Sequence, residues 1–98
     1  MGHTKPSNLR DLQDVLNHIR EWPEIRERAP NVFYYKTTPF LHFHDRDGER
    51  WADVREGADW GAAIDVPFGA GDRHKKGFLK ETERRYHAFT REKPGRAT

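Results

Sequence analysis

The dipeptide Asp47-Gly48 constrains this chain more than any other feature of its sequence. It lies between two runs of alternating apolar and polar residues, and both residue types tolerate the positive φ angles of a two-residue type I′ turn. The stretch from Pro39 to Arg55, PFLHFHDRDGERWADVR, is therefore predicted to be a tight β-hairpin. A four-residue turn over 45–48 would shift the pairing along each strand but leave every side chain on the same face.

The two faces of this hairpin differ in chemistry because strand side chains alternate with a period of two. One face is uniformly apolar and is expected to join the core, through Leu41, Phe43, Ala52 and Val54. The opposite face, called the open face below, is expected to pair Phe40 with Arg55, His42 with Asp53, His44 with Trp51 and Arg46 with Glu49. Trp60 and Ile64 are expected to extend it.

Composition limits the size of the core. In 98 residues the hydrophobic share is 34% and the charged share 35%, so aromatic side chains, at 12%, must supply much of the buried area. A single domain with so small a core would gain from dimerisation. The chain contains no cysteine, which excludes disulfides, thiolate metal sites and thiol nucleophiles.

The flanking segments predict helices and two further strands. Apolar residues at helical spacing predict an amphipathic helix over 8–22, formed by Leu9, Leu12, Val15, Leu16, Ile19 and Trp22. Pro23 disfavours its continuation and predicts a second short helix over 22–30. Residues 31–36 and 60–66 are interpreted as strands, and Asp72 as the N-cap of a final helix that extends to about residue 92.

Together these elements predict an α+β fold, a four-stranded antiparallel meander with N-terminal and C-terminal helices packed on one face. The order is α-α-β-β-β-β-α in a single domain over 1–98, with disorder expected at 1–6 and 93–98. No apolar run is long enough to span a membrane, and the first residues lack a signal-peptide core. We therefore expect a soluble, cytoplasmic protein.

The open face is the first candidate for function. An aromatic surface without a covering layer is expected to serve as a ligand surface or a subunit interface. The sequence contains no phosphate loop, dinucleotide fingerprint or nucleophile elbow, so we expect no cofactor and leave catalysis open. The leading hypothesis is a non-catalytic binding or interaction module that forms a homodimer and can accept a small ligand.

A metal site is the second hypothesis. His42 and His44 point the same way from one strand, and Asp53 on the next strand could be a third ligand, with Trp51 and Arg55 beside them. The run HFHDRD departs from the His-x-His-x-Asp-His pattern of metallo-β-lactamase-like hydrolases in its last two positions. The structural alternative is a cross-strand polar pair of His42 with Asp53, beside His44 packed on Trp51.

Nucleic-acid binding by the final helix is the third hypothesis. Its basic residues could contact phosphates: Lys75, Lys76, Lys80, Arg84 and Arg85. Acidic Glu81 and Glu83 interrupt the run, and Glu81 can pair with Arg85 at i+4 as on an ordinary solvated helix face. We therefore do not expect nucleic acid to be the main partner.

The residues PFLHFH and ADVR resemble a family of small bacterial proteins in which such a run is followed by a glycine turn and Ala-Asp-Val. The resemblance covers about residues 31–66, and the matching positions are Pro39, Phe40, Leu41, His42, Phe43, His44, Gly48, Ala52 and Asp53. It implies that the hairpin recurs. It implies no activity, because none is assigned to that family.

Overall fold

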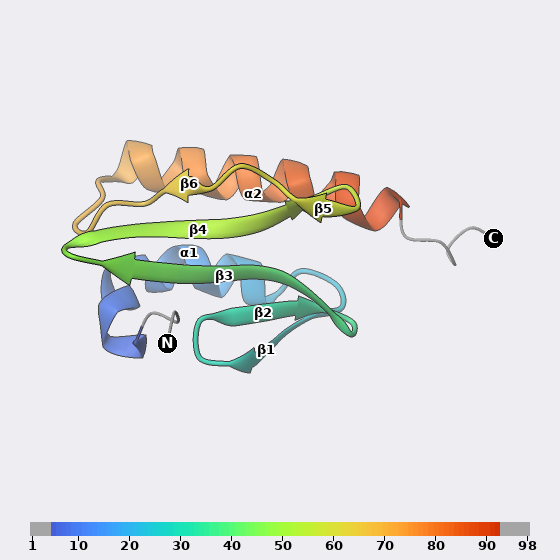
Figure 1. Cartoon of the computed structure of the whole chain (residues 1–98), viewed down its shortest axis with the longest axis horizontal. Helices are drawn as coiled ribbons and strands as arrows, with labels where there is room; N and C mark the ends of the chain where they lie inside the picture. The colour runs from blue at the N-terminus through green and yellow to red at the C-terminus, as the bar shows by residue number, and fades with distance from the viewer. Residues whose placement is uncertain (1–4, 93–98) are drawn as a thin grey trace.

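The hairpin around Asp47 and Gly48 forms the centre of the sheet, as predicted (Figure 1). In the computed structural model, which describes residues 5–92, these two residues have φ angles of 53° and 82°. Two consecutive positive values are what a type I′ turn requires. The strands β3 (Thr38–Arg46) and β4 (Glu49–Glu56) pair antiparallel, with His42 opposite Asp53 and His44 opposite Trp51.

Within residues 5–92 the sheet has six strands rather than the four predicted. The neighbours run in the order β1-β2-β3-β4-β5, and β6 also pairs with β4. Besides the hairpin, the strands are β1 (Ile25–Ala29), β2 (Val32–Tyr35), β5 (Asp59–Trp60) and β6 (Ile64–Asp65). The predicted strand over 60–66 is thus split in two, with Gly61, Ala62 and Ala63 between the parts.

The prediction of a second helix over 22–30 is wrong, because this segment forms β1. Glu24 adopts a positive φ of 66° and turns the chain, and Ile25 then pairs with Tyr35 at the end of β2. Pairing with an otherwise free strand edge outweighs the weak local preference of this segment for a helix. Ile25 is buried, as expected of the anchor of this segment.

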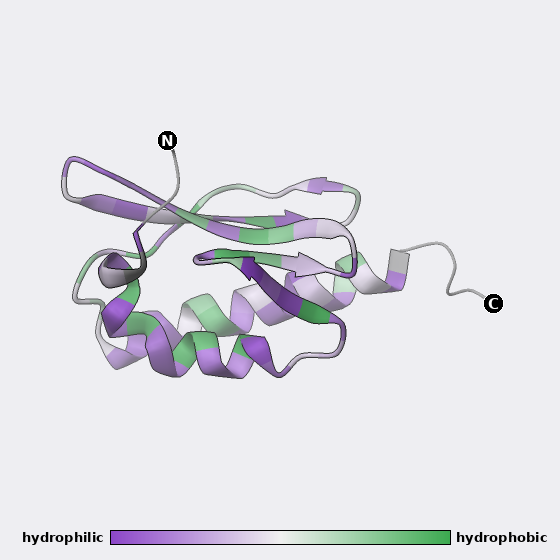
Figure 2. Ribbon diagram, turned by 90° about the horizontal axis from the view of Figure 1, so that it is seen from below, coloured by the Kyte–Doolittle hydropathy of each residue, from purple (hydrophilic) through white to green (hydrophobic). Residues whose placement is uncertain are grey.

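The helices lie on one side of the sheet, as predicted (Figure 2). The expected first helix is a 3-10 helix, η1 (Pro6–Leu12), followed by α1 (Gln13–Arg20), with non-helical angles at Leu9. The final helix is α2 (Asp72–Glu92), and it begins within one residue of the predicted start: Asp72 is its first residue, and the Gly71 carbonyl accepts from the Lys75 N–H at 2.9 Å in the N-cap position predicted for Asp72. No helix within residues 5–92 is long and apolar enough to cross a membrane. The predicted disorder of the two ends falls mostly on 1–4 and 93–98, outside the described residues, and stays a prediction; Pro6 is the first residue of η1.

The core lies between the sheet and the helices. The predicted face of the hairpin, with Leu41, Phe43, Ala52 and Val54, is fully buried there. The apolar side of the first two helical segments is buried against it, and so are Phe78, Tyr86 and Phe89 of α2.

Phe40 belongs to this core and not to the open face, which corrects its predicted pairing with Arg55. Phe33 is opposite Leu41, but the next residue, Tyr34, is opposite Pro39, so β3 has one extra residue at this point. Such a β-bulge interrupts the strict alternation of side chains along a strand. Phe40 and Leu41 are therefore consecutive and both buried.

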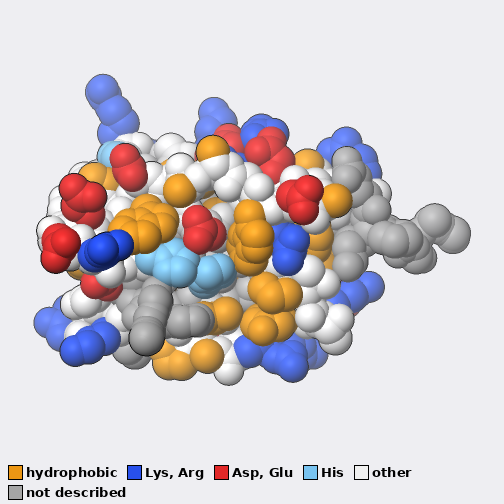
Figure 3. All heavy atoms as spheres, viewed as in Figure 1, with side chains coloured by type: hydrophobic (Ala, Val, Ile, Leu, Met, Phe, Trp, Pro, Cys, Tyr) orange, Lys and Arg blue, Asp and Glu red, His pale blue; other side chains and the backbone are white. Residues whose placement is uncertain are grey.

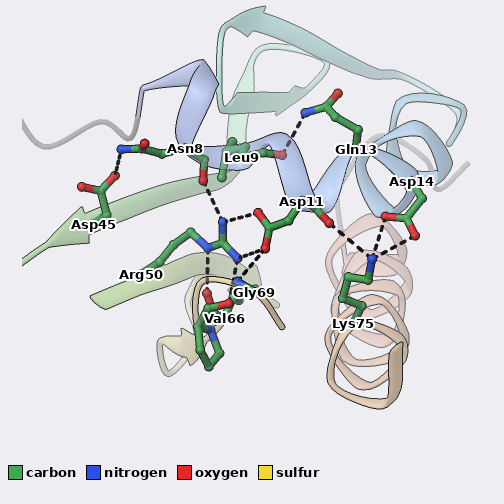
Figure 4. Close-up of polar contacts among 11 residues, drawn as sticks. Asn8, Leu9, Asp11, Gln13, Asp14, Asp45, Arg50, Val66, Gly69 and Lys75 are labelled. Atoms are coloured by element: carbon green, nitrogen blue, oxygen red, sulfur yellow. Dashed lines mark hydrogen bonds and ion pairs between the residues drawn. The ribbon is translucent and has the colours of Figure 1, made fainter. Parts of the chain in front are cut away.

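A buried arginine links the start of the chain to the sheet (Figure 4). Arg50 lies on the core side of β4, and 2% of its surface is exposed. Its guanidinium donates two hydrogen bonds to the Asp11 carboxylate, at 2.8 and 2.9 Å, and one to the Asn8 carbonyl at 2.7 Å. Two more reach the carbonyls of Val66 and Pro67, at 2.7 and 2.8 Å.

We call the hydrogen bonds from Arg50 to Asp11, Asn8, Val66 and Pro67 the Arg50 hub. Together they satisfy every N–H of the arginine side chain. The ring of Phe68 lies 4.5 Å from the guanidinium carbon, and the Gly69 N–H donates to the same Asp11 carboxylate at 3.0 Å. No motif marks Arg50 in the sequence. Its alternation with Ala52 and Val54 already placed it on the core face, where a lone charge requires partners.

Candidate functional site

Two neighbouring strands build the candidate site on the open face. His42 and His44 come from β3, and Trp51 and Asp53 from β4, in the register predicted from the sequence. Residues two apart on a strand share a face, and paired strands lie about 4.8 Å apart, so these four side chains are immediate neighbours. Figure 3 shows histidines in the middle of this face, next to hydrophobic and acidic side chains.

The three predicted metal ligands converge. The rings of His42 and His44 have centroids 4.5 Å apart at an angle of 68°. His44 Nε2 lies 2.9 Å from Asp53 Oδ2. One ligand atom from each of His42, His44 and Asp53 can be chosen so that all three lie within 4.8 Å of one another. Each side chain is half-buried, with 19% of the His44 side chain and 31% of the Asp53 side chain exposed.

The ion pair of Asp53 is diagonal. Asp53 stands opposite His42 in the strand register, yet the imidazole at ion-pair distance from its carboxylate is that of His44. His44 also stacks on Trp51, with centroids 5.5 Å apart and planes 23° apart, as the structural alternative predicted. His44 is thus held from two sides, by an indole and by a carboxylate.

A tryptophan stands at each end of the histidine pair. Trp51 stacks on His44, and Trp60 of β5 meets His42 at a centroid distance of 4.9 Å and an angle of 78°. Trp60 therefore extends the open face as expected. Ile64 does not, because it is partly buried and packs against the core. We call the sequence of contacting rings Trp51, His44, His42 and Trp60 the ring row.

Arg55, also predicted for this site, lies beside Trp60. Its guanidinium carbon is 4.6 Å from the centre of the Trp60 ring. Its Nε donates to the Pro39 carbonyl at 2.6 Å, and Nη1 donates to the Ala58 carbonyl at 3.3 Å. Arg55 therefore holds the indole in place rather than contributing a ligand atom to the histidine pair.

Three of the five predicted phosphate contacts on α2 are paired with acidic side chains of the same chain. Lys75 pairs with Asp14 at 3.2 Å, and Arg84 pairs with Glu81 at 2.6 Å and with Glu56 at 2.7 Å. Arg85 is buried, 2.8 Å from Glu81.

The hydrogen bonds from Arg84 and then Arg85 lower the pKa of Glu81 to about 2. Lys76 and Lys80 are the two predicted phosphate contacts that remain exposed without a described acidic partner. Nucleic-acid binding stays a prediction. Fewer unpaired positive charges are available for it than the sequence suggested.

Dimerisation through the open face also stays a prediction. Among the described residues, Trp60 and Phe68 are the large hydrophobic side chains with substantial exposure. Trp51 and both histidines are half-buried. The apolar area that a second copy could cover is smaller than the sequence suggested.

No protein-family model, curated protein or solved structure matches the chain. The resemblance of the hairpin to a bacterial family stays a prediction. The assignment of function therefore depends on the geometry of the open face.

Proposed function

We propose that the protein is a small metal-binding module whose open face holds one divalent transition-metal ion, with Zn²⁺ the best fit. The observation that carries this proposal is the convergence of ligand atoms from His42, His44 and Asp53 within 4.8 Å. The proposal takes up the second hypothesis from the sequence, a metal site at His42, His44 and Asp53, in place of the leading hypothesis of a homodimeric interaction module.

The donor set suits Zn²⁺ in chemistry and in size. Imidazole nitrogens and a carboxylate oxygen bind Zn²⁺ at about 2.0–2.2 Å, so tetrahedral neighbours lie about 3.3 Å apart. His44 Nε2 and Asp53 Oδ2, at 2.9 Å, are already near this separation. The ligand atoms of the three residues lie within 4.8 Å of one another, so bringing the His42 nitrogen to this separation requires a side-chain rotation.

The surroundings favour a fixed site over a chance cluster. His42 stands at the centre of a nine-residue strand and His44 two residues further along, and stacking on Trp51 restricts the ring of His44. Ligands on paired strands, with their rings packed, lose little freedom when an ion binds. Three protein ligands leave one tetrahedral position for an outside donor.

Metal analysis tests the proposal directly. Purified without an affinity tag and dialysed against Zn²⁺, the protein is expected to retain one equivalent. His42→Ala, His44→Ala and Asp53→Asn should each lower the affinity by more than about 100-fold, because loss of a mere supporting contact already costs about 10–100-fold. Inductively coupled plasma mass spectrometry gives the stoichiometry, and competition with a chelating dye gives the affinity.

The chain offers matched controls. His18→Ala and His87→Ala remove exposed imidazoles from the two helices and should leave binding unchanged. All variants are made in a His3→Ala background, since His3 lies outside the described residues and carries a competing imidazole. Equal losses in His18→Ala and His42→Ala, or no retained metal in the parent protein, would refute the proposed site.

A further inference from the structure

Trp60 is an exposed large side chain that the structure holds rigidly. Of its surface 39% is exposed, although an indole is among the most costly side chains to leave in water. Arg55 covers one part of it at 4.6 Å and is itself tied to two backbone carbonyls. The edge contact with His42 fixes it at the end of the ring row.

Trp60 lies next to the proposed metal ligands, so its exposed indole can contact a molecule bound there. Its ring centre is 4.9 Å from that of His42, so a flat molecule bound to an ion at His42, His44 and Asp53 can reach the indole. Phe68, the other exposed aromatic, instead lies against the Arg50 guanidinium. Among the described residues, Trp60 is thus the exposed aromatic side chain that borders the proposed metal site.

We propose that the fourth ligand is an aromatic nitrogen heterocycle of the imidazole or purine type, with its ring against Trp60. This inference rests on the proposed function, because the heterocycle needs the ion as its anchor. An sp² ring nitrogen is a good donor to Zn²⁺, as the protein's own imidazoles are. A flat π-system gains stacking energy on an indole, whereas an aliphatic carboxylate coordinates the ion without that gain.

The test compares two ligands on the Co²⁺ form of the full chain, whose visible absorption reports a change in the fourth ligand. Benzimidazole is the aromatic probe and acetate the reference anion. In Trp60→Ala the affinity for benzimidazole is expected to fall about tenfold, the size of one stacking contact of about 1.4 kcal/mol. The affinity for Co²⁺ is expected to fall, because His42 loses the ring that packs against it. Both ligands are therefore titrated into Co²⁺-saturated protein, where the affinity for acetate should stay unchanged because Trp60 donates no ligand atom.

Two further variants complete the design. Phe68→Ala removes the other exposed aromatic and should leave both ligand affinities unchanged. Arg55→Gln loosens the indole and should lower only the affinity for benzimidazole, by less than Trp60→Ala.

Failure of the two proposals can be told apart. If Co²⁺ binds in one equivalent but Trp60→Ala leaves the ratio of benzimidazole to acetate affinity unchanged, the ligand class is wrong and the metal site stands. If the parent protein takes up no Co²⁺ and no Zn²⁺, both proposals are overturned. Circular dichroism of each variant checks that the fold is retained.

Discussion

Arg50→Met is expected to lower the free energy of unfolding by about 3–5 kcal/mol, nearer the lower limit. The change leaves the Asp11 carboxylate and the carbonyls of Asn8, Val66 and Pro67 without their common donor. The lower limit applies because the Asp11 side chain is 33% exposed, so water replaces part of the lost interaction. Urea unfolding followed by circular dichroism measures the change.

Two further variants show whether the loss of stability comes from the Arg50 hub. Arg46→Met, at the exposed end of the same hairpin, should alter stability by no more than about 0.5 kcal/mol. Arg50→Lys should be nearly as damaging as Arg50→Met, because one ammonium group cannot reproduce the geometry of five donors. A cost below about 1 kcal/mol for Arg50→Met would show that the buried guanidinium adds little to the net stability.

Arg50→Met should also change how the free energy of unfolding depends on pH. Hydrogen bonds from Arg50 hold the pKa of Asp11 below its ordinary value of 3.8. A lowered folded-state pKa stabilises the fold above the unfolded value, and that stabilisation is lost as the pH falls through the folded value. In Arg50→Met this part of the acid dependence, below about pH 4, should become shallower.

Phe40→Ala is expected to cost about 3–5 kcal/mol, as for other fully buried phenylalanines. Phe40 has no exposed surface, and its ring lies 5.9 Å from those of Tyr86 and Phe89 in α2. Truncation would leave a cavity between the sheet and that helix. Thermal and urea unfolding measure the loss.

This experiment also tests the β-bulge. With strict alternation Phe40 would lie on the open face, and its removal would cost far less. Trp60→Ala, on that face, is the matched control and should cost less than Phe40→Ala, because Trp60 is partly exposed. Equal costs for the two variants would place Phe40 on the open face and contradict the bulge.

The sequence predicted those parts of the fold that local chemistry decides. Asp47-Gly48 determines the turn, and period-two alternation from Leu41 to Val54 then determines the register and the buried face. The helix from Asp72 follows from its spacing of apolar residues. In each case a few neighbouring residues contain the whole signal.

The remaining parts depend on contacts between distant segments. Ile25–Ala29 is a strand because β2 offers it an edge, and no pattern within those five residues requires this. The bulge that buries Phe40 arises from the pairing of β3 with β2 and so lies outside the hairpin signal.

The candidate site divides in the same way. His42, His44 and Asp53 could be named from the hairpin register alone, since alternation places them on one face. Their convergence depends on side-chain rotamers, and so does the diagonal contact of His44 with Asp53. Packing against Trp51 and Trp60 determines these rotamers. The aromatic content of the stretch indicated such packing without giving its geometry.

The Arg50 hub has a consequence for the order in which the fold assembles. Asp11 and Arg50 are 39 residues apart in sequence, whereas the strands on either side of Asp47 need only a two-residue turn to meet. Closing a long loop costs more chain entropy than closing a short one, so we expect the hairpin to form before the hub. Contacts made after the folding barrier govern the rate of unfolding and hardly affect the rate of folding. Arg50→Met is therefore expected to speed unfolding while leaving the rate of folding nearly unchanged, which stopped-flow measurement of both rates would check.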